Sequence, residues 1–363
     1  MMIQQEGAKE ALWELMRDLC AAPTVSGVAV DAERLCASFA ENFDEVRQDA
    51  VGNVILIRRC GREGAPRILV DAHLDEIGLM VSEVCEGGFL RVVPIGGMDP
   101  SVLQAADVCV YGKETLRGVI CSTPPHLRAG SDGELPSPDE LLVDVGRGYS
   151  KEALSELTPV GSAVGFAPIY RRLLGDRVLG KSFDDKACAA CAVYGIAQTP
   201  RERLAGDVYL LLSRYEETSR LGGVTPAVFA IAPDYALVLD VNLGRVPDVP
   251  KHETVVLGEG PSLSLSSGTD LTLTKRVGAL CQKQEIPFVY IASPASTGTN
   301  ATSVQLTRGG IPTADVGLPL QSMHTPCEVI SLADSLSMAS LVSAVICSEE
   351  LAAEFCEKEV VLK

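Results

Sequence analysis

The stretch Leu211-Leu212-Ser213-Arg214-Tyr215-Glu216-Glu217-Thr218-Ser219-Arg220-Leu221 decides how this sequence is interpreted. It overlaps the apolar run Val208 to Leu212, whose length and composition predict a buried strand. Glu216 and Glu217 therefore follow the carboxyl end of a strand, and two adjacent carboxylates both stay ionised only in water or beside a cation. Because charged side chains usually lie in solvent, an isolated Glu-Glu pair indicates an exposed turn. The residues at the ends of the other predicted strands indicate whether this pair lies in an exposed turn or at a cation site.

Polar residues with metal-ligand chemistry follow three further predicted strands. His73 ends the strand Arg67 to Ala72, and Asp75 leaves the same strand end two residues later. Asp240 lies at the end of the strand Tyr235 to Val241, and His324 follows a strand at Thr313 to Val316. Taken alone, each of these residues also has an ordinary structural explanation.

Two more carboxylates, Asp184 and Asp185, stand at the start of an alanine-rich helix predicted from Lys186 to Ala197. Asp is a favoured helix N-cap and suits the positive end of the helix dipole, so a purely structural role is open here as well.

The joint pattern carries more weight than any single residue. Ligands of open α/β sheets gather at the carboxyl ends of strands, where these residues are predicted to lie. Two histidines and several carboxylates form a mixed nitrogen and oxygen ligand set suited to zinc, cobalt or manganese, and they are enough for two ions. Two ions about 3.5 to 4 Å apart polarise a carbonyl and lower the pKa of a bridging water, while a free carboxylate takes its proton.

The order of the predicted elements indicates one α/β domain that is split by an insertion. Helices and strands alternate up to about residue 76 and again after Gly180, which predicts a mainly parallel sheet covered on both faces. Between about Ile77 and Phe166, short apolar runs are broken by Gly and Pro, with a polar stretch from Arg128 to Asp139, as expected of a β-rich module.

Composition narrows the class of protein. The net charge of −17, from 31 Lys and Arg against 48 Asp and Glu, disfavours binding to nucleic-acid phosphates but permits divalent cations. The 12 cysteines are scattered and form no pair of zinc-binding motifs, so we expect core thiols in a reducing compartment. No signal peptide or membrane-spanning run is evident, and a cytoplasmic location without membrane partners is expected.

Five segments together resemble the dinuclear metallo-aminopeptidases of the tetrahedral, glutamyl and deblocking aminopeptidase group. In chain order they are Ala72-His73-Leu74-Asp75-Glu76-Ile77-Gly78, Gly180-Lys181-Ser182-Phe183-Asp184-Asp185-Lys186, Tyr215-Glu216-Glu217, Leu239-Asp240-Val241 and Met323-His324-Thr325-Pro326. Further matches are Gly96-Gly97-Met98-Asp99-Pro100, Gly118-Val119-Ile120-Cys121-Ser122, Pro125-His126-Leu127 and Ser296-Thr297-Gly298-Thr299.

The resemblance implies a role for each matched site residue. His73 and His324 are implied as ligands of separate metals, Asp184 as the bridging carboxylate, and Glu217 and Asp240 as further ligands. Glu216 is implied as the general base, and Asp75 as the residue that orients His73. Two divalent ions per subunit, Zn, Co or Mn, are expected.

The resemblance also implies the architecture and the assembly. We expect a catalytic domain of residues 1–76 and 167–363, with a mixed, largely parallel sheet flanked by helices as in zinc exopeptidases. It is interrupted by residues 77–166, a small β-barrel or PDZ-like domain for dimerisation and oligomerisation. The resemblance implies that the chain forms homo-oligomers, which are dodecameric shells built from dimers. Active sites enclosed in such shells would accept only peptides as substrates.

Three positions depart from the family's usual pattern. Lys186 stands where Arg usually follows the acidic pair, Arg220 is displaced by one position from the usual Arg after the glutamates, and Asn300 replaces a usual Asp. These departures concern substrate preference and efficiency, because all the proposed metal ligands are present.

The predicted function is a metal-dependent aminopeptidase that removes N-terminal residues from short peptides, and alternatives remain open. Gly175 to Ser182 matches a P-loop, but Asp184 and Asp185 would lie beside the phosphates. Two carboxylates can also cleave glycosides, and some family members carry a cellulase label, yet the single Trp13 offers little sugar-stacking surface. A family member with altered or lost activity, or a metal-stabilised scaffold, is the remaining alternative.

Overall fold

The computed structural model describes residues 2–28, 30–121, 140–218, 222–295 and 297–356. Arg220, His126, Ser296 and the polar stretch Arg128 to Asp139 lie outside the described residues.

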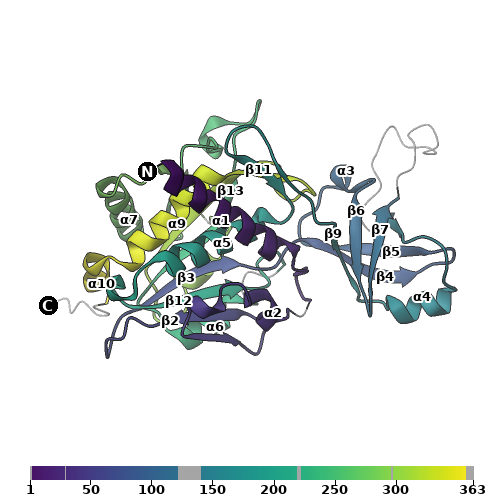
Figure 1. The fold of residues 1–363 in the computed structure, drawn as a ribbon, viewed down its shortest axis with the longest axis horizontal. Coiled ribbons are helices and arrows are strands. Elements are labelled where there is room, and N and C mark those ends of the chain that lie inside the picture. The colour runs from purple at the N-terminus through teal and green to yellow at the C-terminus, as the bar shows by residue number, and fades with distance from the viewer. Residues whose placement is uncertain (1, 29, 122–139, 219–221, 296, 357–363) are drawn as a thin grey trace.

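A mixed sheet forms the centre of the larger body (Figure 1), and four of its inner strands run parallel. The described residues place eight strands in it, in the spatial order β1 (Glu45–Gln48), β2 (Val54–Arg58), β12 (Asp207–Ser213), β3 (Arg67–His73), β13 (Tyr235–Leu243), β16 (Thr313–Leu320), β14 (Ser262–Ser266) and β15 (Val289–Ser293). Parallel strands covered on both faces are apolar throughout, as the buried run of β12 shows. The parallel group β12, β3, β13 and β16 brings four carboxyl ends to one edge.

Helices cover both faces of this sheet. Alternate residues of each strand point to opposite faces, so Ile68 and Val70 join one core cluster while Leu69 joins the other. The first cluster is closed by α1 (Met2–Ala21), α5 (Phe183–Gln198), α7 (Leu271–Lys283) and α9 (Leu332–Ile346). The second cluster is closed by α6 (Val224–Ile231) and α8 (Ala301–Gln305). Trp13 lies in the first core cluster, so it is not available as a sugar-stacking surface.

A smaller body at the right of Figure 1 is a closed antiparallel barrel. In the described part of the chain its strands are, in order around the barrel, β4 (Gly78–Val84), β5 (Phe89–Ile95), β8 (Leu142–Asp144), β7 (Thr115–Ile120), β6 (Asp107–Tyr111) and β9 (Ala163–Phe166). Two short helices, α3 (Pro100–Leu103) and α4 (Lys151–Leu157), accompany them. The barrel encloses its own apolar core. The predicted class, α/β with an inserted small barrel, is confirmed.

Local boundaries differ from the sequence-based expectation where side chains cap the helices. The sequence from Leu332 to Phe355 predicts one last helix, but the chain forms α9 and α10 (Glu349–Phe355), because the Ser348 hydroxyl accepts the backbone N–H of Leu351 at 3.2 Å and starts a new helix. The helical spacing of Leu35 and Phe39 predicts a helix from Val30 to Phe43, but the structure has only α2 (Ala32–Cys36) followed by a short 3₁₀ turn. A further small sheet pairs β10 (Tyr170–Arg172), β11 (Arg177–Gly180) and β17 (Glu328–Ser331).

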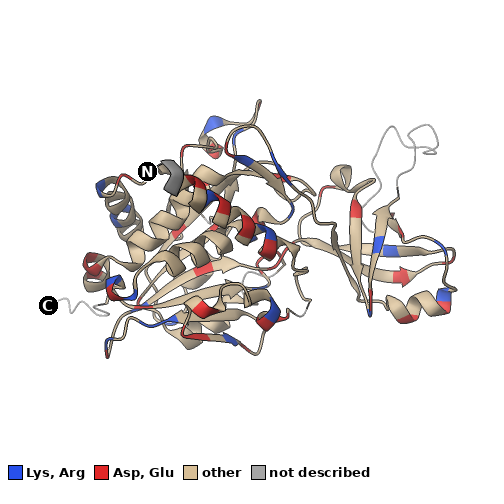
Figure 2. Ribbon diagram, in the orientation of Figure 1, with Lys and Arg blue, Asp and Glu red and all other residues tan. Residues whose placement is uncertain are grey.

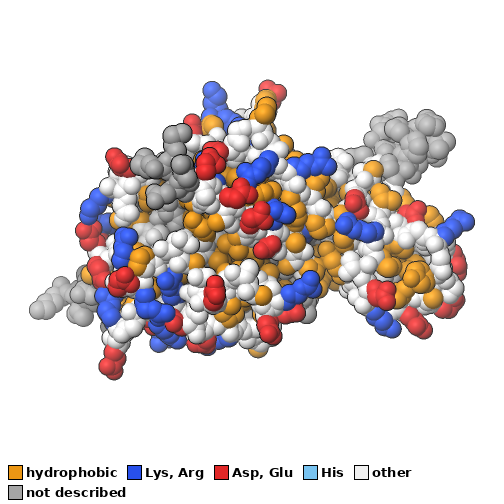
Figure 3. All heavy atoms as spheres, viewed as in Figure 1, with side chains coloured by type: hydrophobic (Ala, Val, Ile, Leu, Met, Phe, Trp, Pro, Cys, Tyr) orange, Lys and Arg blue, Asp and Glu red, His pale blue; other side chains and the backbone are white. Residues whose placement is uncertain are grey.

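The surface carries charges of both signs. Acidic and basic residues are interspersed over both bodies (Figure 2). On the face in Figure 3, hydrophobic side chains gather toward the middle, near the junction with the barrel. Within the described ranges, no single helix is long and apolar enough to cross a membrane. The bent pair α9 and α10 meets the length and composition criteria only when the two helices are taken together.

A buried ionic cluster lies where the chain leaves β3 for the barrel. Glu76 accepts hydrogen bonds from the Lys181 ammonium and the Ser182 hydroxyl, and its Oε1 lies 3.1 Å from Lys186 Nζ. All three charged side chains are buried. Burial opposes ionisation, but the two ammonium groups lower the pKa of Glu76 to about 2. Lys181 therefore binds a carboxylate of its own chain, which removes the lysine that a P-loop needs for a phosphate.

We predict that Glu76→Gln lowers the free energy of unfolding by about 3 to 5 kcal/mol, because it leaves two buried ammonium groups without a counter-charge. Urea denaturation of the metal-free protein measures the change. Glu253→Gln is the control, since Glu253 is exposed and its one ion pair among the described residues is with exposed His252. Equal stabilities of the two variants would contradict the prediction.

Candidate active site

The carboxyl ends of the four parallel strands bring most of the predicted site residues together. His73 is the last residue of β3, and Glu216 and Glu217 follow β12 within four residues. Asp240 lies within β13, which extends to Leu243 rather than ending near Asp240. His324 follows β16 in the turn that leads to β17. The sheet register, set by buried apolar strands, thus decides where these polar side chains meet.

Asp184 reaches the same place from the start of α5, and its two carboxylate oxygens face different histidines. Oδ1 lies 3.0 Å from His73 Nε2, and Oδ2 lies 3.2 Å from His324 Nε2. Asp184 and Asp185 do not have helical backbone angles, although they fall within α5. The two residues therefore do not continue the helical turn, and the Asp184 side chain lies between the two imidazoles.

The remaining side chains fall beside one histidine or the other. His324 Nε2 lies 3.3 Å from Glu217 Oε2, and His73 Nε2 lies 3.8 Å from Asp240 Oδ1. Donor atoms of His73, Asp184 and Glu217 lie within 4.8 Å of one another, and so do those of His73, Asp185 and Asp240. Asp185, which the sequence left as a possible cap, thus joins the cluster.

The cluster holds a surplus of negative charge, and the pKa values show it. Burial and, for Asp240, the neighbouring Asp185 raise the pKa of both Asp240 and Glu217. Hydrogen bonds to Asp184 and Glu217 raise the pKa of His324 to about 10. Burial opposes protonation of His73, yet Asp184 and Asp240 raise its pKa. Carboxylates that resist ionisation beside imidazoles that hold protons are the signature of a site that lacks positive charge.

The donor set fits divalent cations. Among the described residues, the buried oxygens Asp185 Oδ1 and Glu217 Oε1 have no hydrogen-bond partner. Buried polar atoms are almost always paired, so such oxygens point to a ligand. Imidazole nitrogens and carboxylate oxygens are ligands of zinc, cobalt and manganese.

Asp75 holds the chain segment of the two glutamates. Its Oδ1 and Oδ2 accept the backbone N–H groups of Glu216 and Glu217 at 3.2 and 3.3 Å. The expected contact to His73 is made by the Asp75 backbone carbonyl, 2.9 Å from Nδ1, whereas the nearer carboxylate oxygen is 3.7 Å away. Asp75 thus contacts His73 through its main chain and the glutamates through its side chain.

Two other buried carboxylates repeat this arrangement. Asp185 Oδ2 accepts the backbone N–H of His73 at 3.2 Å. Glu328 accepts the backbone N–H groups of Asp184 and His324. Sequence reasoning missed Glu328, whose only signal is an acidic residue directly before the apolar residues of a strand.

A cavity of about 630 Å³ opens onto the cluster. Its lining includes Asp184, Glu216, Glu217, Asp240 and His324, together with Gly97 of the loop that leaves the barrel strand β5. A Cβ atom at Gly97 would lie 3.5 Å from His324 Nδ1, so the barrel loop packs closely against this histidine.

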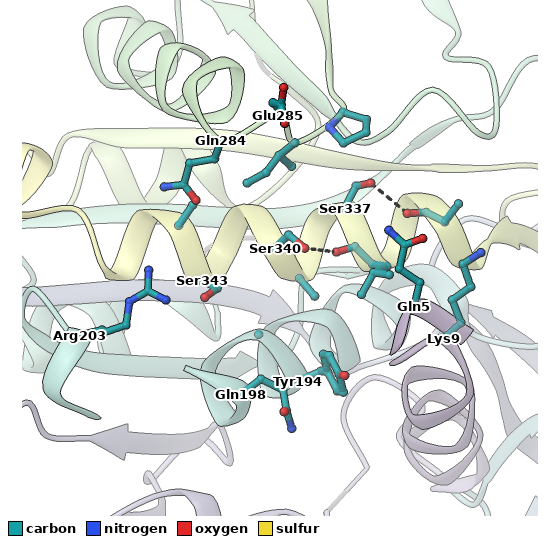
Figure 4. Close-up of a pocket in the computed structure, with 17 residues that line it drawn as sticks. Gln5, Lys9, Tyr194, Gln198, Arg203, Gln284, Glu285, Ser337, Ser340 and Ser343 are labelled. Atoms are coloured by element: carbon teal, nitrogen blue, oxygen red, sulfur yellow. Dashed lines mark hydrogen bonds between the residues drawn. The ribbon is translucent and has the colours of Figure 1, made fainter. Parts of the chain in front are cut away.

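A second cavity of similar volume, about 630 Å³, lies elsewhere along α9 (Figure 4). There the hydroxyls of Ser337 and Ser340 donate to carbonyls of their own helix at 3.0 and 2.8 Å. Glu285 is the only acidic residue among its described lining residues, and none is a histidine. The chemistry therefore belongs to the first cavity.

Comparisons with known proteins agree with this geometry. Residues 52–341 match the family model described as M42 glutamyl aminopeptidase. The chain belongs to the M42 family. It is 33% identical to the lysyl aminopeptidase of Pyrococcus furiosus, over 93% of this chain and 97% of that protein.

Solved M42-like structures share the fold over nearly the whole chain. Aminopeptidase APDkam598 from the archaeon Desulfurococcus kamchatkensis has a TM-score of 0.87 at 29% identity, covering 98% of this chain and 99% of that chain. The Pyrococcus horikoshii TET1 peptidase, described as assembling into a tetrahedron or a large octahedral shell, has a TM-score of 0.79 at 26% identity, covering 92% and 99%. Other similar structures are described as an endoglucanase and as a peptidase/endoglucanase. This M42 chain is a hydrolase of the aminopeptidase class.

Two of the departures from the family pattern have local partners in the structure. Lys186 Nζ lies beside Glu76 and donates to the Ala22 carbonyl at 3.0 Å, so it points away from the candidate ligands. Asn300 Nδ2 donates to Asp71 Oδ2 and to Ser213 Oγ, both at 3.0 Å. Burial raises the pKa of Asp71 to about 6 despite these donors. An Asp at position 300 would set a second carboxylate against Asp71, which an amide avoids.

We predict that metal binding by this M42 protein releases protons at pH 8. Hydrogen bonds to Asp184 and Glu217 raise the pKa of His324 to about 10, so the metal-free imidazole is protonated at pH 8 and must lose its proton to bind an ion. The affinity for Co²⁺ therefore increases as the pH rises toward about 10.

Calorimetric titration of Co²⁺ in two buffers with different ionisation enthalpies counts the released protons. His324→Asn should release fewer protons than the native chain. Binding at pH 8 without proton release would show that the imidazole is already neutral.

Proposed function

We propose that this chain is a dinuclear metal-dependent aminopeptidase in which Glu216 is the general base. His73, Asp240 and Asp184 would hold one divalent ion, and His324, Glu217 and Asp184 the other. Zn, Co and Mn are the candidates, since each accepts imidazole and carboxylate ligands. The single observation that carries the proposal is the Asp184 carboxylate, which has one oxygen beside each histidine.

Two divalent ions held by these residues would supply Lewis acidity, which polarises a carbonyl group and lowers the pKa of a bound water. The Glu216 carboxylate, which lines the cavity, takes a proton from that water as its oxygen bonds to the carbonyl carbon. Glu216 then donates the proton to the leaving nitrogen as the carbon–nitrogen bond breaks. Asp75 keeps Glu216 in place through the backbone N–H of that residue.

The substrates we propose are peptides with a free amino terminus. A protonated or metal-directed α-amine fits a cavity whose charged lining is carboxylate-rich. Membership of the family does not determine which side chain is preferred at the amino terminus of the substrate. The family is described by a glutamyl aminopeptidase, whereas the relative from Pyrococcus furiosus is a lysyl aminopeptidase.

Glycoside hydrolysis is less well supported by the same cavity. Sugar sites use aromatic side chains as stacking surfaces, and the described residues that line the cavity include no Phe, Tyr or Trp. A glycosidase that uses two carboxylates also has no need of histidines. Here two histidines lie within 3.3 Å of carboxylates that line the cavity.

We further propose that residues 1–76 and 167–363 form the catalytic domain and that residues 77–166 form the domain for dimerisation and oligomerisation. The separate barrel core supports this division. A dodecamer built from dimers is proposed by analogy with the TET1 peptidase, and a cytoplasmic location from twelve described cysteines that are all free thiols.

Glu216→Gln should lower kcat by about 10²- to 10⁴-fold while two ions per chain stay bound, because the amide cannot accept the proton of water. The assay follows amino acid release from aminoacyl-p-nitroanilides by protein reloaded with Zn, Co or Mn, with metal content measured in parallel. Glu217→Gln is the matched comparison and should lose metal as well as activity.

N-acetylated peptides and a soluble cellulose derivative complete the assay. Release from acetylated peptides would argue against recognition of a free amine. Cleavage of the cellulose derivative, without peptide hydrolysis, would replace the proposal with the glycosidase alternative. Full activity of Glu216→Gln would remove Glu216 from the mechanism.

We expect light scattering of the full chain to give twelve times the mass of one subunit. A Val119→Glu and Val160→Glu double variant should give smaller species, because both side chains are exposed on the barrel and a charge there opposes an apolar contact. Leu306→Glu, an exposed position on the larger body, is the control. Loss of assembly in the control alone would contradict the role given to the barrel.

A further inference from the structure

Glu328 connects two segments that are distant in the sequence and adjacent at the site. Its Oε2 accepts the backbone N–H of Asp184 at 3.2 Å, and its Oε1 accepts the backbone N–H of His324 at 3.1 Å. The side chain is 2% exposed. A single buried carboxylate thus contacts the main chain of both residues.

The strand pairing explains why Glu328 can reach both amides. Glu328 begins β17 and pairs with Gly180 of β11, the strand that leads through Lys181 to Asp184. On its other side, Val329 and Gln321 exchange backbone hydrogen bonds at 2.9 and 3.0 Å and close the turn that carries His324. Both segments are therefore fixed at their bases by backbone pairing and at their tips by one side chain.

The buried position of Glu328 is unfavourable for a carboxyl group that only fills space. Among the residues that the structure describes, Glu328 forms no ion pair, and burial together with the nearby Asp184 carboxylate raises its pKa to about 8. An apolar side chain would avoid this cost. A carboxyl group, however, offers two acceptor oxygens to two amides at once, which the side-chain amide of Gln cannot do.

We infer that Glu328 is a positioning residue, which holds Asp184 and His324 at the separation that binding of two metal ions requires. The inference rests on the proposed function, in which Asp184 bridges the two ions and His324 binds one of them. Glu328 touches neither ion nor substrate in this scheme and acts through the two backbone amides. Its loss should therefore loosen metal binding before it changes the chemistry.

Asp334 provides a matched control within the same part of the fold. Its two oxygens accept the backbone N–H groups of Gly258 and Gly260 at 2.7 and 2.8 Å, and its side chain is also buried. The bonding pattern is that of Glu328, but the amides belong to a turn that carries none of the proposed ligands. Asp334→Asn should cost stability without affecting metal binding.

The experiment compares Glu328→Gln with Asp334→Asn in the full chain by calorimetric titration with Co²⁺ and by the visible absorption spectrum of the Co²⁺-loaded protein. Glu328→Gln should bind Co²⁺ about 10- to 100-fold more weakly and change the spectrum at saturation. Asp334→Asn should keep the native affinity and spectrum. Glu328→Asp keeps both carboxyl oxygens but is one methylene shorter, and it should give an intermediate affinity if Glu328→Gln does not fold.

Native Co²⁺ affinity and spectrum in the Glu328 variants, or an equal loss in Asp334→Asn, would overturn the inference. A native chain that binds two ions but cleaves no peptide would refute the proposed activity, whereas the affinity comparison would still decide the role of Glu328. A native chain that binds no Co²⁺, Zn²⁺ or Mn²⁺ would refute both.

Discussion

Repulsion between carboxylates at one edge of the sheet is the constraint on which the structure of the site depends. Asp184, Asp185, Glu216, Glu217 and Asp240 converge there, largely removed from solvent. Two unit charges 4 Å apart repel by about 1 kcal/mol in water but by about 4 kcal/mol at the lower effective dielectric constant near a protein surface. Burial raises the pKa of Asp185, Asp240 and Glu217, and cations bound at this edge would relieve the repulsion and favour the ionised carboxylates.

The fold manages this constraint by using backbone amides rather than cationic side chains near the candidate ligands. Asp75, Asp185 and Glu328 each accept backbone N–H groups of residues in the cluster. An amide hydrogen fixes a segment in place without occupying the carboxylate oxygens that an ion needs. The lysines follow the same logic, since Lys181 and Lys186 lie close to Asp184 in the sequence but bind Glu76. Their ammonium groups are directed at that carboxylate and away from the candidate ligands.

The sequence predicted the parts of this site that depend on strand geometry. His73, Glu216, Glu217 and Asp240 could be placed together because apolar runs identify parallel strands, whose carboxyl ends meet at one edge. The residues that hold the ligands in place were harder to find. Glu328 acts through main-chain atoms of Asp184 and His324, and its partners become visible only when β17 is paired with β11. The carbonyl contact of Asp75 to His73 escaped prediction for the same reason, because side-chain identity says little about a main-chain acceptor.

The position of the barrel in the chain ties it to the site. It begins directly after His73, Asp75 and Glu76, and a Cβ atom at Gly78 would come within 2.6 Å of the Val25 side chain and 2.8 Å of the Val164 carbonyl. Glycine at position 78 therefore lets the first barrel strand pack closely against Val25 of the larger body. At the far end of β5, Gly96 has φ +82°, a conformation that glycine adopts without strain, and it directs Gly97 toward His324. The loop of the inserted barrel therefore contributes Gly97 to the lining of the cavity, beside the candidate ligands.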